Sequence, residues 1–227
     1  MKVRIRFSKT GALVYIGHLD VMRYFQKLFR RSGIPVAYTE GFSPHQILSF
    51  SHPLPLGMES VGEYADVELT ERITTKEALA NMRKMSVPEI EILSFKELPE
   101  KCENAMASVS AARYEVMFEK DIHFPDIKRA AYDFMSKDEV VVLKRSKKNE
   151  KEVNIRPLVY ELEADAQNGC IRMLVSSGSR DNIKPELVIG AMLSVSTIES
   201  GDLKMKRIDQ YTGDDFISLD DIGKEIK

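Results

Sequence analysis

Residues 41–57 read GFSPHQILSFSHPLPLG, and this stretch decides more about the fold than any other. Its prolines are Pro44, Pro53 and Pro55. Proline fixes φ and removes a backbone donor, so neither a regular helix nor a central strand runs through the whole stretch. A short apolar run at residues 47–50 lies between His45 and His52. We predict a short strand with a polar loop before it and a proline-rich turn after it.

The flanking residues repeat with the periods of strands and helices. Residues 3–7 alternate apolar and basic side chains, which predicts a half-buried strand. Apolar residues recur at helical spacing over 19–29, and Gly33 ends that helix. The pattern Thr74-x-x-Glu77 is a capping box that opens a second helix. Further strands are predicted at 36–38 with 47–50, at 64–69 and at 87–95. The resulting order, β-α-β-β-α-β, is that of a ferredoxin-like unit.

The second half of the chain shows the same order. Strands are predicted at 114–118, 140–143, 153–163, 171–175 and 203–208, and helices at 127–135 and 185–193. In both halves a polar loop, Thr39–His45 or Lys144–Lys151, splits the second strand. We therefore predict an α+β protein of two tandem ferredoxin-like units with antiparallel sheets. The expected parts are residues 1–99, residues 110–211 and an acidic tail at 212–227.

Composition and charge narrow the function classes. The 227 residues are 43% hydrophobic and 30% charged, as in ordinary globular proteins. Because its net charge is −2, the chain as a whole is not a general binder of polyanions. The charge is uneven, because residues 1–50 carry eight Lys/Arg against two Asp/Glu, whereas residues 59–103 carry six against eleven. This asymmetry indicates a basic binding face or two segments that neutralise each other.

The two cysteines and the N-terminus indicate the compartment. Cys102 and Cys170 have no redox or metal spacing, so we expect a reducing cytoplasm. The N-terminus lacks the apolar segment of a signal peptide, and no apolar run approaches the roughly 18 residues of a membrane span. We therefore expect a cytoplasmic protein with no cofactor, no metal and no membrane partner.

A basic stripe is the main candidate binding feature. Arg23, Lys27 and Arg30 follow at i, i+4 and i+7 on the first predicted helix, with Arg31 beside them. Such a stripe attracts phosphates, although a solvated helix face has the same pattern. The other candidate nucleic-acid contacts are Lys147, Lys148, Arg156, Ser179 and Arg180. The last two precede a helix, where loop amides can bind an anion.

Acid–base residues are scarce. His18 and His45 are the candidate catalytic histidines, with Asp20 or Asp66 as neighbouring acids. No HxH or HxxxH pair predicts a metal site. Arg4 and Arg6 are expected on the same sheet face as Tyr64, Asp66 and Glu68, where ordinary cross-strand ion pairs are the structural interpretation.

Several runs resemble the bacterial radical-SAM-linked family, DUF2344. The resemblance covers about residues 1–210, and residues 3–70 are its specific part. The family's SHLD-type element corresponds to residues 17–20, and its GFNPHP-type element to residues 41–46. Within the latter, Ser43 and Gln46 stand where the family pattern has asparagine and proline.

The resemblance implies a role beside another protein, because the family's domain stands alone or accompanies a B12-binding radical SAM protein. This chain lacks the CxxxCxxC triad of a radical SAM cluster. The leading hypothesis is a non-catalytic accessory protein that binds RNA and assists a radical SAM partner. One alternative is an RNA-processing or RNA-modifying enzyme that uses His18 and His45. The other is a protein-interaction module, indicated by the acidic tail.

Overall fold

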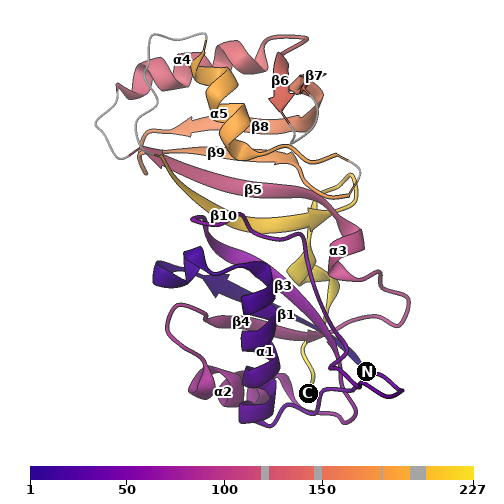
Figure 1. The fold of residues 1–227 in the computed structure, drawn as a ribbon. Helices are drawn as coiled ribbons and strands as arrows, with labels where there is room; N and C mark the ends of the chain where they lie inside the picture. Colours follow the sequence, from indigo (N-terminus) through magenta and orange to yellow (C-terminus); the bar gives the residue numbers. More distant parts are fainter. Residues whose placement is uncertain (119–122, 146–149, 180, 195–202) are drawn as a thin grey trace. The chain divides into compact units, whose positions relative to one another are not determined.

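The computed structural model describes residues 1–118, 123–145, 150–179, 181–194 and 203–227. The chain is a mixed α+β protein with a mostly antiparallel sheet (Figure 1). It divides into two compact units. The first unit is Met1–Ser110 with Arg207–Lys227, and the second is Ala111–Lys206. The expected boundaries differ from this division chiefly at the C-terminus, where residues 207–227 belong to the first unit.

The first unit has the predicted element order. Its elements are β1 (Lys2–Lys9), the 3₁₀ helix η1 (Gly11–Tyr15), α1 (His18–Ser32), β2 (Leu48–Phe50), β3 (Glu59–Glu68), α2 (Thr75–Met85), β4 (Ile92–Glu97) and the short helix α3 (Ala105–Ser108). β1 lies between β3 and β4, and β2 pairs with β3. Residues 207–212 of β10 (Leu203–Thr212) continue the sheet beyond β3, and β11 (Ile217–Ser218) pairs with β10.

The apolar face of this sheet explains the packing of the two helices. Val3, Ile5 and Phe7 alternate along β1 and are all buried. They share one core with Phe25 and Leu28 of α1 and with apolar residues of α2. Burying a large apolar side chain contributes about 1.5–3 kcal/mol, so this shared face holds α1 and α2 on the sheet.

Local signals set the helix ends as predicted. α1 is followed by Gly33 with φ 68°, a left-handed conformation that favours glycine. The Thr74 hydroxyl accepts the backbone N–H of Glu77 at 3.2 Å, which confirms the capping interaction at the start of α2. The strand predicted at 87–95 begins instead at Ile92, because residues 87–90 form a turn in which Ile90 N–H donates to the Val87 carbonyl at 3.1 Å.

The C-terminal residues form no free acidic tail. Leu219, in the 3₁₀ helix η3 (Leu219–Ile222), is 0% exposed and Ile226 is 3% exposed. The Lys96 ammonium lies 2.8 Å from the Asp220 carboxylate. Ile226 and Thr75 exchange two hydrogen bonds, at 3.0 and 2.9 Å. These residues therefore form part of the first unit, although their acidic composition indicated a solvated segment.

The second unit has the expected neighbouring strands at 109–118 and 170–176 but differs from the prediction in its second strand. Its elements are β5 (Val109–Phe118), α4 (Phe124–Met135), β6 (Val141–Arg145), β7 (Glu150–Asn154), the 3₁₀ helix η2 (Arg156–Leu158), β8 (Val159–Asp165), β9 (Cys170–Ser176) and α5 (Pro185–Leu193). β9 lies between β5 and β8, whereas β6 and β7 pair with each other as a separate hairpin. The predicted second strand is thus three strands, because η2 at Pro157 separates β7 from β8.

Candidate nucleic-acid interface

The basic stripe lies on the solvent side of α1. Val21, Phe25 and Leu28 define the buried side of this helix. The opposite side is exposed and carries all four predicted cations, Arg23, Lys27, Arg30 and Arg31. An amphipathic helix with this pattern presents its charges to solvent. The structure therefore leaves the stripe accessible to a ligand.

Few of these charges are neutralised nearby. Arg23 lies 3.1 Å from the Asp20 carboxylate, but both side chains are more than half exposed, so the pair contributes little. Arg30 Nε donates to the Gln26 carbonyl at 3.1 Å and keeps its full charge. The side chains of Lys27 and Arg31 form no ion pair or hydrogen bond with the described residues. The stripe is thus a net positive surface.

The polar loop predicted at 39–45 is the tip of a narrow hairpin, which we call the 37–47 hairpin. Thr39 N–H donates to the His45 carbonyl at 2.9 Å, and Ile47 N–H donates to the Ala37 carbonyl at 2.8 Å. The chain reverses through Gly41, whose φ of 109° favours glycine. Backbone and side-chain bonds thus hold the loop in one defined shape.

The 37–47 hairpin is fastened to α1 by one buried side chain. Gln46 is 6% exposed. Its Nε2 donates to the Gln26 carbonyl at 3.5 Å and to the Tyr38 hydroxyl at 3.3 Å. Arg30 donates to the same Gln26 carbonyl. The base of the hairpin therefore lies directly beside the basic side of α1.

Aromatic side chains on this hairpin face solvent. Phe42, at the tip, is fully exposed, and Tyr38 is 49% exposed. His45 is exposed as well, and its Nδ1 lies 3.1 Å from the Thr39 hydroxyl. The hairpin that is bonded to α1 through Gln46 therefore carries exposed rings, and α1 carries exposed cations.

The three candidate catalytic residues lie in different surroundings. The His18 ring packs edge-on against Phe50, with centroids 5.4 Å apart. Asp20 is engaged with Arg23, and His45 lies on the hairpin. Within the described residues no hydrogen bond, ion pair or ring contact joins His18, Asp20 and His45 to one another.

The cavity beside His18 is too small for a substrate. It is lined by Lys9, Ser51 and Glu63 among others, and its volume is about 20 Å³. That volume holds about one water molecule. Lys9 is itself used to hold the chain before α1, since its ammonium donates to the Ile16 carbonyl at 2.8 Å. Burial lowers the pKa of the Lys9 ammonium.

A buried ion pair that the sequence did not reveal lies behind this cavity. Arg207 donates to both carboxylate oxygens of Glu63, at 2.8 and 2.6 Å, and to the His52 carbonyl at 2.9 Å. Burial, followed by the positive charge of Arg207, lowers the pKa of the His52 imidazole. Glu63 and Arg207 are 144 residues apart, so no local pattern could have paired them.

Asp66 forms the cross-strand pair with Arg4. The guanidinium lies 2.7 and 2.9 Å from the two carboxylate oxygens, and Ala105 N–H donates to one of them at 2.7 Å. Both oxygens are thus engaged. This occupancy favours the structural interpretation of Asp66 over a role as a proton carrier.

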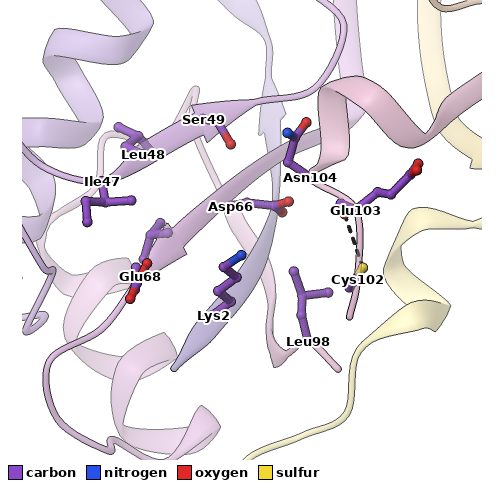
Figure 2. Close-up of a pocket in the computed structure, with 11 residues that line it drawn as sticks. Lys2, Ile47, Leu48, Ser49, Asp66, Glu68, Leu98, Cys102, Glu103 and Asn104 are labelled. Atoms are coloured by element: carbon purple, nitrogen blue, oxygen red, sulfur yellow. Dashed lines mark hydrogen bonds between the residues drawn. The ribbon is translucent and has the colours of Figure 1, made fainter. Parts of the chain in front are cut away.

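A pocket of about 180 Å³ opens next to this pair. Figure 2 shows Asp66 projecting from β3 toward the segment that carries Cys102, Glu103 and Asn104. The charged residues that line the pocket are the acids Asp66, Glu68 and Glu103 and the cation Lys2. Because carboxylates predominate, this pocket disfavours phosphate, and the nucleic-acid interface is better placed on α1.

The profile of a family described as an uncharacterized protein conserved in bacteria, DUF2344, matches residues 2–185. This chain belongs to the DUF2344 family. The family expected from the motifs at residues 17–20 and 41–46 is thereby confirmed. The match includes α1 and the 37–47 hairpin, whereas Arg207 and the C-terminal residues lie beyond it.

Solved structures add a likeness of fold. The DUF2344 chain resembles a chain in the crystal structure of a Cbf5-Nop10-Gar1 complex, with a TM-score of 0.53 and 13% identity. The match covers 96% of this chain and 53% of that one, so this chain spans about half the length of its structural neighbour. At this identity the likeness shows the fold alone. Among curated proteins, none matches the chain significantly.

The remaining residues that were predicted to contact nucleic acid belong to the second half of the DUF2344 chain. Arg156 caps α4, because its guanidinium donates to the Met135 carbonyl at 3.2 and 2.9 Å and to the Val159 carbonyl at 3.0 Å. Ser179 is exposed. Lys147, Lys148 and Arg180 lie outside the described residues.

Two features are absent from the described residues of the DUF2344 chain. Across them, no three His, Cys, Asp or Glu side chains are grouped so that they could hold a metal ion. In the same part of the chain, no helix is both long and apolar enough to cross a membrane.

Proposed function

We propose that this protein is a non-catalytic accessory protein that binds RNA on the first unit, across α1 and the 37–47 hairpin. The observation that carries the proposal is the carbonyl of Gln26, which accepts from both Arg30 and Gln46. This shared acceptor joins the basic stripe and the aromatic hairpin into one surface. The positive balance of residues 1–50 supports the same location.

The physical basis of the binding is the release of counterions. Each phosphate that a Lys or Arg neutralises adds about 0.7 to the slope of log affinity against log salt for single strands, and about 0.9 for duplex DNA. Arg23, Lys27, Arg30 and Arg31 are all exposed and can each reach a phosphate. Affinity for RNA is therefore expected to fall steeply as salt rises.

The test reverses the charge of the stripe. The variant Arg23→Glu/Lys27→Glu/Arg30→Glu should lose most RNA affinity and reduce the salt slope by about 2 to 3. A matched control, Lys128→Glu/Arg129→Glu/Lys137→Glu, makes the same charge change at exposed positions of the second unit. Fluorescence anisotropy with labelled RNA measures both. Equal affinity in wild type and the stripe variant would falsify the proposal.

We also propose that the protein acts with a radical SAM enzyme. The family resemblance implies this partner, and the two cysteines of the chain cannot form a cluster-binding triad. Mass spectrometry of proteins that co-purify with the natively expressed chain tests the proposal. Recovery of a radical SAM protein is the expected result, and repeated recovery of other partners without one contradicts it.

The fold assignment that we propose is two tandem ferredoxin-like units. In the first unit the sheet order β4-β1-β3-β2, with α1 and α2 on one face, supports it. In the second unit the support is weaker, because β6 and β7 form their own hairpin. An experimental structure in which β8 and β9 are not neighbours would contradict the assignment for that unit.

A further inference from the structure

The tip of the 37–47 hairpin holds an aromatic ring in solvent at a defined place. Hydrogen bonds join Thr39 to His45 through the backbone at 2.9 Å and through the Thr39 hydroxyl at 3.1 Å. Gln46 fastens the base of the hairpin to α1. The Phe42 side chain is nevertheless fully exposed, so the hairpin does not bury this ring. The hairpin therefore presents the ring outward.

The cations of α1, to which the base of the hairpin is bonded, favour a polyanion as the partner of this surface. The exposed cations of α1 outnumber the exposed acids Asp20 and Glu40 of the same region. Tyr38, 49% exposed, contacts Gln46 and so lies between these cations and the tip. Surfaces that combine cations along a backbone path with exposed rings bind single-stranded nucleic acid, because unpaired bases stack on the rings.

We propose that Phe42 is a stacking platform for an unpaired base, so that the ligand of this surface is single-stranded RNA. The inference rests on the proposed function and specifies its substrate class. A duplex keeps its bases stacked internally and offers a side chain at this position only sugar and phosphate contacts. A ring that projects from this hairpin gains a base contact in a single strand but not in a duplex.

The experiment compares two ligands and two kinds of variant. A labelled 12-nucleotide oligouridylate and a 12-base-pair RNA duplex are titrated with the full chain by fluorescence anisotropy. Phe42→Ala should weaken binding of the single strand by about 5- to 150-fold, the loss expected for one base stacked on an aromatic ring. It should leave duplex binding and the salt slope unchanged, because every cation remains. Phe42→Trp should restore single-strand affinity, whereas Phe42→Leu should not.

A control variant excludes a general effect of lost apolar surface. Leu56 is 65% exposed in the same unit and lies outside the hairpin, so Leu56→Ala should bind as wild type does. Since Phe42 is fully exposed, its variants should keep the wild-type melting temperature.

The outcomes separate the two proposals. Loss of binding on reversal of the stripe, with no effect of Phe42→Ala on the single strand, overturns the stacking inference and leaves RNA binding in place. Tighter binding of the duplex than of the single strand also overturns it. Phe42-dependent binding to phosphatidylserine vesicles, without binding to the oligonucleotide, assigns the surface to a membrane and overturns both.

Discussion

The guanidinium of Arg30 and the carboxamide of Gln46 donate to the same carbonyl oxygen, that of Gln26, at 3.1 and 3.5 Å. Gln46 belongs to the 37–47 hairpin, and Arg30 to the last turn of α1. This one acceptor brings a cation and the base of an aromatic hairpin together. The buried amide of Gln46 thus ties the hairpin to α1, in addition to the backbone bonds that tie it to β3, where Ala37 N–H donates to the Glu68 carbonyl at 2.7 Å and Glu68 N–H donates to the Ile47 carbonyl at 3.2 Å.

Replacement of Gln46 by alanine should loosen the hairpin. The change removes the donor to Gln26 and Tyr38, and a net hydrogen bond contributes about 0.5–1.5 kcal/mol. The backbone amides of Thr39 and Ile47 should then exchange faster in hydrogen–deuterium exchange. Thr70→Ala, which removes a hydroxyl bond to the Pro35 carbonyl outside the hairpin, is the control and should leave those amides unchanged. Unaltered exchange in the Gln46 variant would show that the backbone alone holds the hairpin.

The Arg4–Asp66 pair should behave as a structural element. Arg4 is 1% exposed and the Asp66 side chain 10% exposed, so Asp66→Asn leaves a buried guanidinium without its counter-charge. We expect a loss of about 3–5 kcal/mol in the free energy of unfolding, measured in urea. The double variant Arg4→Met/Asp66→Leu should lose less than the sum of the single changes, because it leaves no unpaired charge. Additive losses would contradict this interpretation.

Two glycines should respond to alanine in opposite directions. A Cβ on Gly62 of β3 would lie 2.5 Å from the Asp209 Cα and the Ile208 carbonyl oxygen, so Gly62→Ala must push β3 and β10 apart. Gly190 in α5 has open space around the added atom, and Gly190→Ala should stabilise by about 0.5–1 kcal/mol. Thermal unfolding distinguishes the two, and a stable Gly62→Ala variant would contradict the close approach of the strands.

The buried surroundings of His52 should make stability fall in acid. Burial and then Arg207 lower the pKa of the His52 imidazole in the folded protein. The unfolded chain therefore binds this proton more readily, beginning near the ordinary histidine pKa of about 6.5. Stability is retained above that pH and decreases as the pH falls through it. The free energy of unfolding at pH 7.5 minus that at pH 5.5 should be smaller in His52→Gln than in wild type. Equal differences would count against His52 as a source of the pH dependence.

The amino-acid sequence by itself determined the elements whose signals are local. The end of α1 at Gly33 and the capping of α2 by Thr74 depend on residues within a few positions of each other. The basic stripe is likewise visible, because i, i+4 and i+7 positions share one side of any helix. The alternation in β1 and β3 also predicted that Arg4 and Asp66 share one sheet face, whereas the register that pairs them came from the structure.

Only the tertiary structure decided which distant segments meet. The docking of residues 207–227 into the first unit and the pair Glu63–Arg207 join positions more than one hundred residues apart. The hydrogen bond from Gln46 to the Gln26 carbonyl joins residues that are closer in sequence. It too is a side-chain contact that no periodic sequence pattern predicts. Local periodicity reports which side of an element is buried. Contacts between elements depend on the packing of the whole chain, and no short window of sequence contains that information.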